Sequence, residues 1–339
     1  MMMQRVLAQT FAAASRLRMH QYDTGQLAVT RLPGARVISV GNIAVGGRGK
    51  TPLACFIASW YATAGIDAAL LLRGYKGTME SKGGLVSAGE GPLVSAIAAG
   101  DEAHMASWQC PGVQVRVGKH RIAQGRAAIA KGAKIIVLDD GFQHRQLARD
   151  LNIVSVSPGD LAPDAAFFPK GRLRETPAAV SRADLLVGYQ SDWLGRDDGP
   201  PVQFAHHPDG LWQQHFESLP LAALPQRVHL LCGIEVPERF IQTVKTLGTT
   251  ITSMSLFRDH HRFPPRQVRD AAAIARHNGA DALLTTAKDL ARLQHITAEL
   301  PIHGLRTRLV VTRGMDTLQN HLCRLTENDI KSAPHHANP

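Results

Sequence analysis

A glycine-rich loop between an apolar run and a helical stretch is the feature of this sequence that most directly indicates chemistry. Residues 44–51 read Ala-Val-Gly-Gly-Arg-Gly-Lys-Thr and follow the apolar run 37–40. Glycines let backbone N–H groups close around phosphate oxygens, and the start of the following helix adds its positive dipole end. In such a Walker A loop the lysine reaches the outer phosphates of ATP and the threonine hydroxyl ligates Mg²⁺. The nucleotide-binding residues predicted are Ala44, Val45, Gly46, Gly47, Arg48, Gly49, Lys50 and Thr51.

Ala44 occupies the position where the strict motif has glycine, and we expect it to be tolerated if the backbone there is ordinary. A glycine-rich turn that only caps a helix is the alternative interpretation.

A second motif consists of four apolar residues, 135–138, followed by Asp139 and Asp140. Carboxylates at the tip of a parallel strand lie at the carboxyl edge of the sheet, where they can hold Mg²⁺ beside the P-loop threonine. The pattern therefore predicts a Walker B strand. A strand that ends in an ordinary Asp-Gly turn is the alternative.

Asp101 and Glu102 open a stretch that predicts a helix, and they add two acids near the same edge. Either could ligate the metal, or Asp101 could take a proton from a substrate hydroxyl. Such a pair is also common at helix starts, and the pattern alone favours that interpretation.

Basic residues in loops that follow strands are further candidates for binding phosphate, because arginine recognises phosphate in a bidentate manner. Each of them, taken singly, is more often a solvated charge. They are Arg73, Lys170, Arg172 and Arg174.

From residue 37 on, short β-rich runs alternate with longer helical stretches. This alternation predicts an α/β fold with a P-loop NTPase-like, mostly parallel sheet and flanking helices. The predicted strands are 37–40, 68–72, 113–117, 135–138, 153–156, 185–187, 228–231, 251–256 and 282–285, and the predicted helices are 52–63, 119–131, 238–247 and 267–277. The cations of the second helix, Arg121 among them, indicate a solvated face.

A proline-rich stretch interrupts this rhythm and indicates a boundary between two lobes. We predict an N-terminal basic amphipathic segment (1–36), a P-loop domain (37–200), a connecting segment (201–227), a smaller α/β lobe (228–330) and a frayed tail (331–339). The first 20 residues suit either a helix on a membrane surface or a docked surface helix.

The composition limits the possible partners. Lysine and arginine number 38 against 28 acidic residues, a net charge of +10 that attracts phosphates, nucleic acid or an anionic membrane surface. No run of 18 apolar residues occurs, and the four cysteines lack the spacing of a zinc site. Aromatic residues that could stack on bases are few, and no recognisable nucleic-acid-binding motif occurs, so we expect no nucleic-acid partner.

In combination, the motifs resemble the tetraacyldisaccharide 4'-kinase family of the lipid A pathway. The resemblance rests on Val40-Gly41-Asn42 leading into the P-loop, Lys50-Thr51-Pro52, Arg73-Gly74-Tyr75, Gly100-Asp101-Glu102, Asp139-Asp140-Gly141-Phe142-Gln143-His144 and Leu173-Arg174-Glu175, with weaker matches at Asp259-His260 and Thr286-Ala287-Lys288-Asp289.

The resemblance implies transfer of the ATP γ-phosphate to the 4'-hydroxyl of a tetraacyldisaccharide 1-phosphate. It places the enzyme, with Mg²⁺, at the cytoplasmic face of the bacterial inner membrane, and we expect a monomer. It implies Asp101 as the base, assisted by His260. The expected metal-side residues are Thr51, Asp139, Asp140, Glu102 and Glu175, and the expected substrate-side residues are Arg73, Gln143, His144 and Arg174. A P-loop NTPase switch or metallochaperone acting on a protein partner is the alternative.

Overall fold

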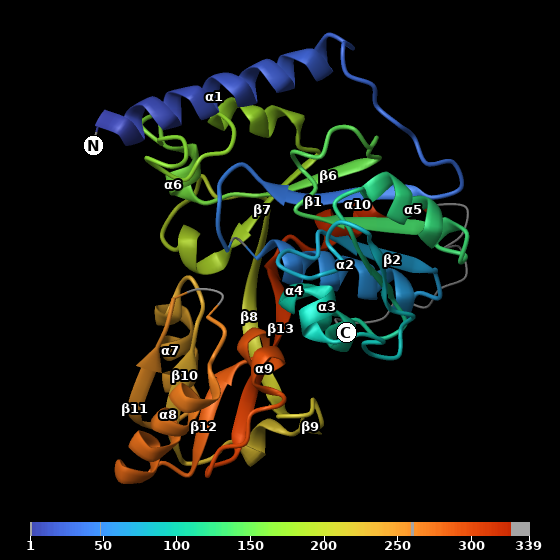
Figure 1. The fold of residues 1–339 in the computed structure, drawn as a ribbon. Coiled ribbons are helices and arrows are strands. Elements are labelled where there is room, and N and C mark those ends of the chain that lie inside the picture. The colour runs from blue at the N-terminus through green and yellow to red at the C-terminus, as the bar shows by residue number, and fades with distance from the viewer. Residues whose placement is uncertain (1, 48, 259–260, 327–339) are drawn as a thin grey trace. The chain divides into compact units, whose positions relative to one another are not determined.

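The protein is described by a computed structural model that covers residues 2–47, 49–258 and 261–326. The chain forms two compact units (Figure 1). Unit 1 comprises the chain up to Ala205 and from Leu309 onward, and unit 2 comprises His206–Arg308.

Unit 1 is a mostly parallel sheet covered by helices. Its strands are β1 (Arg36–Asn42), β2 (Ala68–Leu72), β3 (Gly84–Ser87), β4 (Gln114–Val117), β5 (Ile135–Asp139), β6 (Leu151–Ser155), β7 (Leu185–Tyr189) and the first part of β8 (Val202–Gln213). Its helices are α1 (Met2–Asp23), α2 (Lys50–Thr63), α3 (Ala96–Ala99), α4 (Asp101–Gln109), α5 (Arg121–Ile129), α6 (Pro158–Leu161) and α10 (Met315–Cys323), with 3₁₀ turns at Pro177–Arg182 and Gln190–Trp193.

Among the described strands β1 to β8 the order is β8-β7-β6-β1-β5-β2-β4-β3, and these neighbours pair in parallel except for β4 and β3, which are antiparallel. β1 is central, between β5 and β6. Because neighbouring parallel strands end at the same edge, the loops after β1, β2, β4 and β5 gather at one place. The predicted fold class is confirmed.

The two faces of this sheet pack against different helices, because successive strand residues point to opposite sides. In β5, Ile135 and Val137 join a core with residues of α2 and α4. Ile136 and Leu138 join the opposite core, which includes Ala128 of α5. β5 is therefore buried on both sides, and its apolar run fixes the position of the carboxylates that follow it.

Unit 2 is a smaller α/β unit. It contains the remainder of β8, β9 (Ser218–Leu219), β10 (Arg227–Cys232), β11 (Thr250–Leu256), β12 (Ala282–Thr286) and the start of β13 (Ile302–Arg313), with α7 (Pro237–Thr246), α8 (Pro265–His277), α9 (Ala287–Leu293) and a 3₁₀ turn at Leu221–Ala223. Strands β11, β10, β12 and β13 are parallel in that order. Phe240 and Val244 of α7 pack on this sheet beside Leu230.

The boundaries differ from the predicted ones in two respects. The proline-rich segment contains the 12-residue strand β8, in which Pro208 lies between the part that pairs with β7 and the part that pairs with β9. The chain also returns to unit 1 at Leu309, so α10 is not part of the smaller lobe. The Tyr61 hydroxyl of α2 donates a hydrogen bond to the Leu322 carbonyl of α10 over 2.8 Å.

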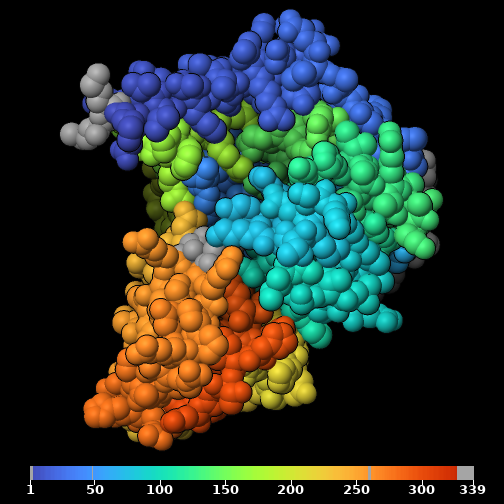
Figure 2. Space-filling model, in the orientation of Figure 1, coloured from blue at the N-terminus to red at the C-terminus, as the bar shows by residue number. Residues whose placement is uncertain are grey.

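Helix α1 lies along the surface of unit 1 (Figure 2). Its small residues Ala8 and Ala12, and Tyr22 near its end, are buried. The Ser15 hydroxyl donates to the Arg174 carbonyl over 2.8 Å. The helix nevertheless leaves large apolar side chains exposed: Met3, Val6, Leu7, Phe11 and Leu17. Among the described residues, no helix combines the length and the apolar character needed to cross a bilayer.

Candidate active site

The Walker A loop joins the central strand β1 to α2. Gly46 has φ 101° and Gly49 has φ 69°, a left-handed conformation that favours glycine. A Cβ atom on Gly49 would lie 2.7 Å from the Phe204 ring and 2.9 Å from the Tyr189 hydroxyl. Gly49 is therefore required by space as well as by conformation.

The first position of the motif tolerates alanine for a local reason. Ala44 forms an antiparallel β-bridge with Leu173, so its backbone is extended, as any residue can be. The next residue, Val45, donates its N–H to the Arg172 carbonyl over 2.7 Å and accepts a bond from the Arg172 guanidinium at 3.0 Å. Arg48 lies outside the described residues.

The first two residues of α2 reach the acids at the end of β5. The Thr51 hydroxyl donates to Asp139 Oδ2 over 2.8 Å. Lys50 Nζ donates to the Gly46 carbonyl over 3.0 Å and lies 3.7 Å from Asp140 Oδ1. The parallel register of β1 and β5 brings the two motifs to the same edge of the sheet, so the structure joins Walker A to Walker B.

Asp139 is buried, and its carboxylate is short of partners. Burial, followed by the charges of Glu102 and Asp140, raises the pKa of Asp139 to about 7, although the Thr51 hydrogen bond and Lys50 oppose this shift. Asp139 Oδ1 is buried without a hydrogen-bond partner. A carboxylate left in this state beside a threonine hydroxyl is suited to a bound cation.

Mg²⁺ does not need a site in which protein side chains supply all of its ligands. Within residues 2–47, 49–258 and 261–326, no three His, Cys, Asp or Glu side chains converge on a metal position. Mg²⁺ usually keeps several waters and binds through one or two carboxylates plus phosphate oxygens. Thr51 and Asp139 fit this chemistry.

Asp140 is held in a different environment from its neighbour. It has φ 52°, and Arg174 donates to both of its oxygens, over 2.8 and 2.7 Å. Arg174 also donates to the Asn42 side-chain oxygen. Burial alone would raise the pKa of Asp140, but Lys50 and Arg174 outweigh it and hold the pKa well below the usual range. The pKa values of the two adjacent aspartates are thus shifted in opposite directions, because Arg174 pairs with Asp140, whereas burial and the neighbouring acids outweigh Lys50 at Asp139.

Gln143 is fixed by a buried carboxylate. Its amide donates to the Asn42 carbonyl over 2.8 Å and to Glu175 Oε1 over 2.9 Å. Arg182 donates to the other oxygen, Glu175 Oε2, over 2.6 Å, and its guanidinium lies 4.6 Å from the centre of the Phe142 ring. Both oxygens of Glu175 thus have protein partners, so the geometry gives this residue a part in orienting Gln143.

Asp101 and Glu102 are the first two residues of α4. The N-cap position belongs to Gly100, with φ 83°, and no side chain caps this helix. Asp101 and Glu102 nevertheless lie in the first turn of α4, where acids interact favourably with the positive end of the helix dipole, so the helix-start interpretation stays open. The Glu102 charge contributes to the raised pKa of Asp139, so the two carboxylates lie within electrostatic range of each other.

Arg73 and His144 have defined local partners. Arg73 Nε donates to Glu80 over 2.6 Å from an exposed position. His144 Nε2 lies 2.9 Å from the Gln146 amide nitrogen. Burial, followed by Arg121 and Arg149, lowers the pKa of His144 to about 4, so its imidazole is neutral at neutral pH.

Arg121 is the site residue that the sequence pattern concealed. The charged stripe of 119–131 predicted a solvated face, but Arg121 is buried at the first position of α5 and donates to the Gly118 carbonyl. Burial lowers its pKa to about 10, and Asp139 and Asp140 act against that shift. The available signal was its position a few residues after a predicted strand, where the sheet edge collects ligand-binding groups.

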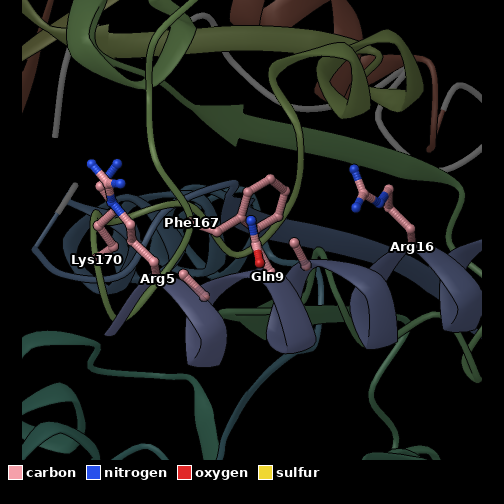
Figure 3. Close-up of a pocket in the computed structure, with 7 residues that line it drawn as sticks. Arg5, Gln9, Arg16, Phe167 and Lys170 are labelled. Carbon is pink, nitrogen blue, oxygen red and sulfur yellow. The ribbon is translucent and has the colours of Figure 1, made fainter. Parts of the chain in front are cut away.

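A shallow pocket of about 420 Å³ lies between α1 and the loop that carries Phe167 and Lys170 (Figure 3). Figure 3 shows Arg5 and Lys170 together on one side, Gln9 and Phe167 in the middle and Arg16 on the other side. Three cations and no acid line this pocket, which also contains Ala8 and Ala12. Next to it, the Phe11 and Phe168 rings meet edge to face at 6.1 Å.

The fold and this edge define a P-loop nucleotide-binding protein, in which a Walker A threonine is bonded to a Walker B aspartate. The model of the Tetraacyldisaccharide-1-P 4'-kinase family matches residues 2–326. The chain belongs to that family, so the predicted family is confirmed.

Individual relatives agree. The tetraacyldisaccharide 4'-kinase of Desulfotalea psychrophila is 31% identical over 331 residues, which is 94% of this chain and 95% of the relative. That of Anaeromyxobacter dehalogenans is 37% identical over 328 residues, which is 91% of this chain and 86% of the relative. A crystal structure of LpxK from Aquifex aeolicus in complex with ATP has a TM-score of 0.78 and 30% identity, and it covers 95% of this chain and 98% of that one.

Proposed function

We propose that this chain transfers the γ-phosphate of ATP to the 4'-hydroxyl of tetraacyldisaccharide 1-phosphate, which gives the 1,4'-bisphosphate of lipid A biosynthesis. The observation that carries the proposal is the Thr51–Asp139 hydrogen bond beside Lys50, in a chain that belongs to this kinase family. The relatives bear the name of this activity, and the related crystal structure contains ATP. An NTPase switch acting on a protein partner is not favoured by these comparisons.

Phosphoryl transfer demands chiefly positioning and charge neutralisation, and different residues of unit 1 would supply each of these. Backbone N–H groups of the P-loop and the start of α2 would hold the phosphates. Lys50 would neutralise charge on the leaving phosphate oxygens. Thr51 and Asp139 would hold Mg²⁺, which supplies further positive charge at the phosphates when bound.

Asp101 is the proposed base. Its carboxylate would accept the proton of the 4'-hydroxyl as the oxygen attacks the γ-phosphorus and the bond to the β-phosphate oxygen breaks. The low pKa of Asp140 and its pairing with Arg174 make Asp140 a poor proton acceptor, which supports this assignment. His260 lies outside the described residues, and its assistance to Asp101 stays a prediction.

Gln143, His144, Arg73 and Arg174 are proposed to face the lipid substrate. Neutral His144 can donate or accept a hydrogen bond to a sugar hydroxyl, and Gln143 is oriented by Glu175 for the same purpose. These roles suit a polar disaccharide, because hydroxyl groups need partners of both kinds.

We further propose that α1 contacts the anionic inner-membrane surface at its cytoplasmic face. Exposed Met3, Leu7 and Leu17 offer apolar area, and Arg5 and Arg16 add cations beside it. Sedimentation with phosphatidylglycerol vesicles tests this: binding should be strong at low salt, and Leu7→Glu together with Leu17→Glu should reduce it. Equal binding to uncharged phosphatidylcholine vesicles would contradict the proposal that the cations of α1 attract an anionic surface.

The proposed activity is tested by incubating γ-labelled ATP with detergent-dispersed tetraacyldisaccharide 1-phosphate. The proposal predicts a labelled bisphosphate lipid that disappears when Mg²⁺ is chelated. ATP hydrolysis without labelled lipid would instead favour the NTPase-switch class.

A further inference from the structure

Arg121 is a buried cation at the carboxyl edge of the sheet in unit 1. It is the first residue of α5, a few residues after β4, and only 7% of its surface is exposed. Its Nη1 donates to the Gly118 carbonyl. In the part of the chain that the structure describes, Arg121 forms no ion pair with an acid. A buried guanidinium in this state has lost its water without gaining a counter-charge, which disfavours the fold.

Main-chain hydrogen bonds fix the turn before Arg121 beside the end of β2. The Gly118 N–H donates to the last carbonyl of β2 over 3.1 Å, and the Lys119 N–H donates to the Glu80 carbonyl over 2.9 Å. The Glu80 carboxylate accepts a bond from Arg73 Nε over 2.6 Å. Because β2 lies between β4 and β5 and pairs in parallel with both, this turn lies at the same edge as the acids that follow β5.

The acids that follow β5 lie within electrostatic range of Arg121. Burial lowers the pKa of Arg121 to about 10, and the charges of Asp139 and Asp140 oppose this shift without cancelling it. Arg121 is therefore charged at neutral pH, although its surroundings favour the charge less than water does. After burial, Arg121 is also the largest cause of the lowered pKa of His144. An anion bound among these side chains would supply the counter-charge that the protein does not.

The strand order indicates which anion reaches Arg121. Lys50 follows β1 on one side of β5, and Arg121 follows β4 on the other side, so the two cations lie on opposite sides of the acids after β5. Among the cations described at this edge, Arg174 is paired with Asp140 and Arg73 with Glu80. A phosphoryl group that leaves the P-loop side would approach Arg121, whose guanidinium can contact two phosphate oxygens at once.

We propose that Arg121 is a catalytic residue that binds the phosphoryl group as it passes from ATP to the 4'-hydroxyl, and then the 4'-phosphate of the product. The inference rests on the proposed function. The acceptor oxygen forms a bond to the γ-phosphorus, the bond to the β-phosphate oxygen breaks, and the hydroxyl proton passes to Asp101. Arg121 keeps its protons throughout and stabilises the charge on the oxygens of the group in transfer.

Arg121→Gln is the first test, with Arg126→Gln, an exposed position of the same helix, as the matched control. Arg121→Gln should lower kcat about 100- to 1,000-fold, as expected when one donor to a transition-state oxygen is lost, while the KM for ATP changes by less than about threefold. Its Tm should equal or exceed that of the wild type, because the variant removes a buried charge without a counter-charge. Arg126→Gln should resemble the wild type. A normal kcat in folded Arg121→Gln would overturn the proposal.

The 1-phosphate of the lipid is a second phosphate that could contact Arg121, and an acceptor that lacks it separates the two sources. With a tetraacyldisaccharide without the 1-phosphate, Arg121→Gln should lower kcat by the same factor as with the full substrate, because the group in transfer is still present. If the variant and the wild type use this acceptor equally well, Arg121 binds the 1-phosphate and the proposal is overturned.

A transition-state analogue tests the contact without any lipid. ADP, Mg²⁺ and aluminium fluoride together imitate the phosphoryl group in transfer, so fluoride should raise the Tm of the wild type and of Arg126→Gln above the value with ADP and Mg²⁺ alone. Arg121→Gln should lose most of this additional shift, and no difference between Arg121→Gln and the wild type would overturn the proposal. If Arg121→Gln does not fold, Arg121→Lys replaces it, because lysine keeps the charge but lacks the planar fork. If the wild type makes no bisphosphate lipid, the proposed function fails, and this comparison still decides whether Arg121 binds the group in transfer.

Discussion

Arg182→Met should lower the stability of unit 1 by an amount that its surroundings allow us to estimate. Arg182 neutralises Glu175, whose side chain is 3% exposed, across 2.6 Å. Removing one partner of a fully buried pair costs about 3–5 kcal/mol. The Arg182 side chain is 24% exposed, so water can partly solvate Glu175 in the variant. We therefore expect the free energy of unfolding to fall by about 2–3 kcal/mol. Methionine keeps an apolar contact with the Phe142 ring, so the substitution tests the loss of the charge and not the loss of packing.

Thermal unfolding followed by circular dichroism measures this loss. For a unit of this size each kcal/mol shifts the Tm by about 2–4 °C, so Arg182→Met should unfold about 5–10 °C lower. Arg196→Met removes an exposed pair with Asp198 and should leave the Tm unchanged. Glu175→Gln combined with Arg182→Met removes the buried charge and should recover at least half of the loss. A normal Tm for Arg182→Met, or no recovery in the double variant, would refute the reasoning.

Three further predictions concern the charges at the sheet edge. The folded-state pKa of Asp139, about 7, exceeds its usual value of 3.8, so its contribution to stability is present below pH 3.8 and is lost as pH rises towards 7. Denaturant titrations in EDTA should therefore show that Asp139→Asn is more stable than the wild type at pH 8, by up to about 4 kcal/mol. Near pH 4 the free energies of unfolding of the two proteins should be equal. Equal stability at pH 8 would contradict this prediction. His144 has a lowered pKa of about 4, so its NMR resonances should not titrate between pH 5 and 8, and a midpoint near 6.5 would contradict its burial. Lys50→Ala should weaken ATP binding in calorimetry and turnover together, whereas Asp101→Ala should lose turnover alone; unchanged turnover in the second variant would exclude Asp101 as the base.

The strands that carry the site could be predicted closely because they are buried on both faces. The apolar runs 68–72 and 135–138 coincide with β2 and with all but the last residue of β5. Strands with mixed surroundings were not predictable in this way. β8 contains Pro208, and β13 mixes buried, partly buried and exposed residues, so neither gives a continuous apolar run.

The site itself was predictable in its residue types but not in its pairings. Spacing and strand position indicated that Thr51 and Asp139 would meet, because both follow neighbouring strands. Nothing in the sequence indicates that Arg182, seven residues after Glu175, neutralises it, or that Arg121 turns inward from a charged stripe. These contacts depend on loops whose paths are set by tertiary packing.

The position of the new phosphate on the lipid product tests the central claim most directly. Wild-type protein, ATP, Mg²⁺ and tetraacyldisaccharide 1-phosphate should give a product heavier by one phosphate, with a second phosphomonoester located at the 4' carbon by ³¹P–¹H correlation. Asp101→Ala, assayed at equal ATP occupancy, should give almost none. Phosphate at another position, or unmodified lipid despite ATP consumption, would contradict the account.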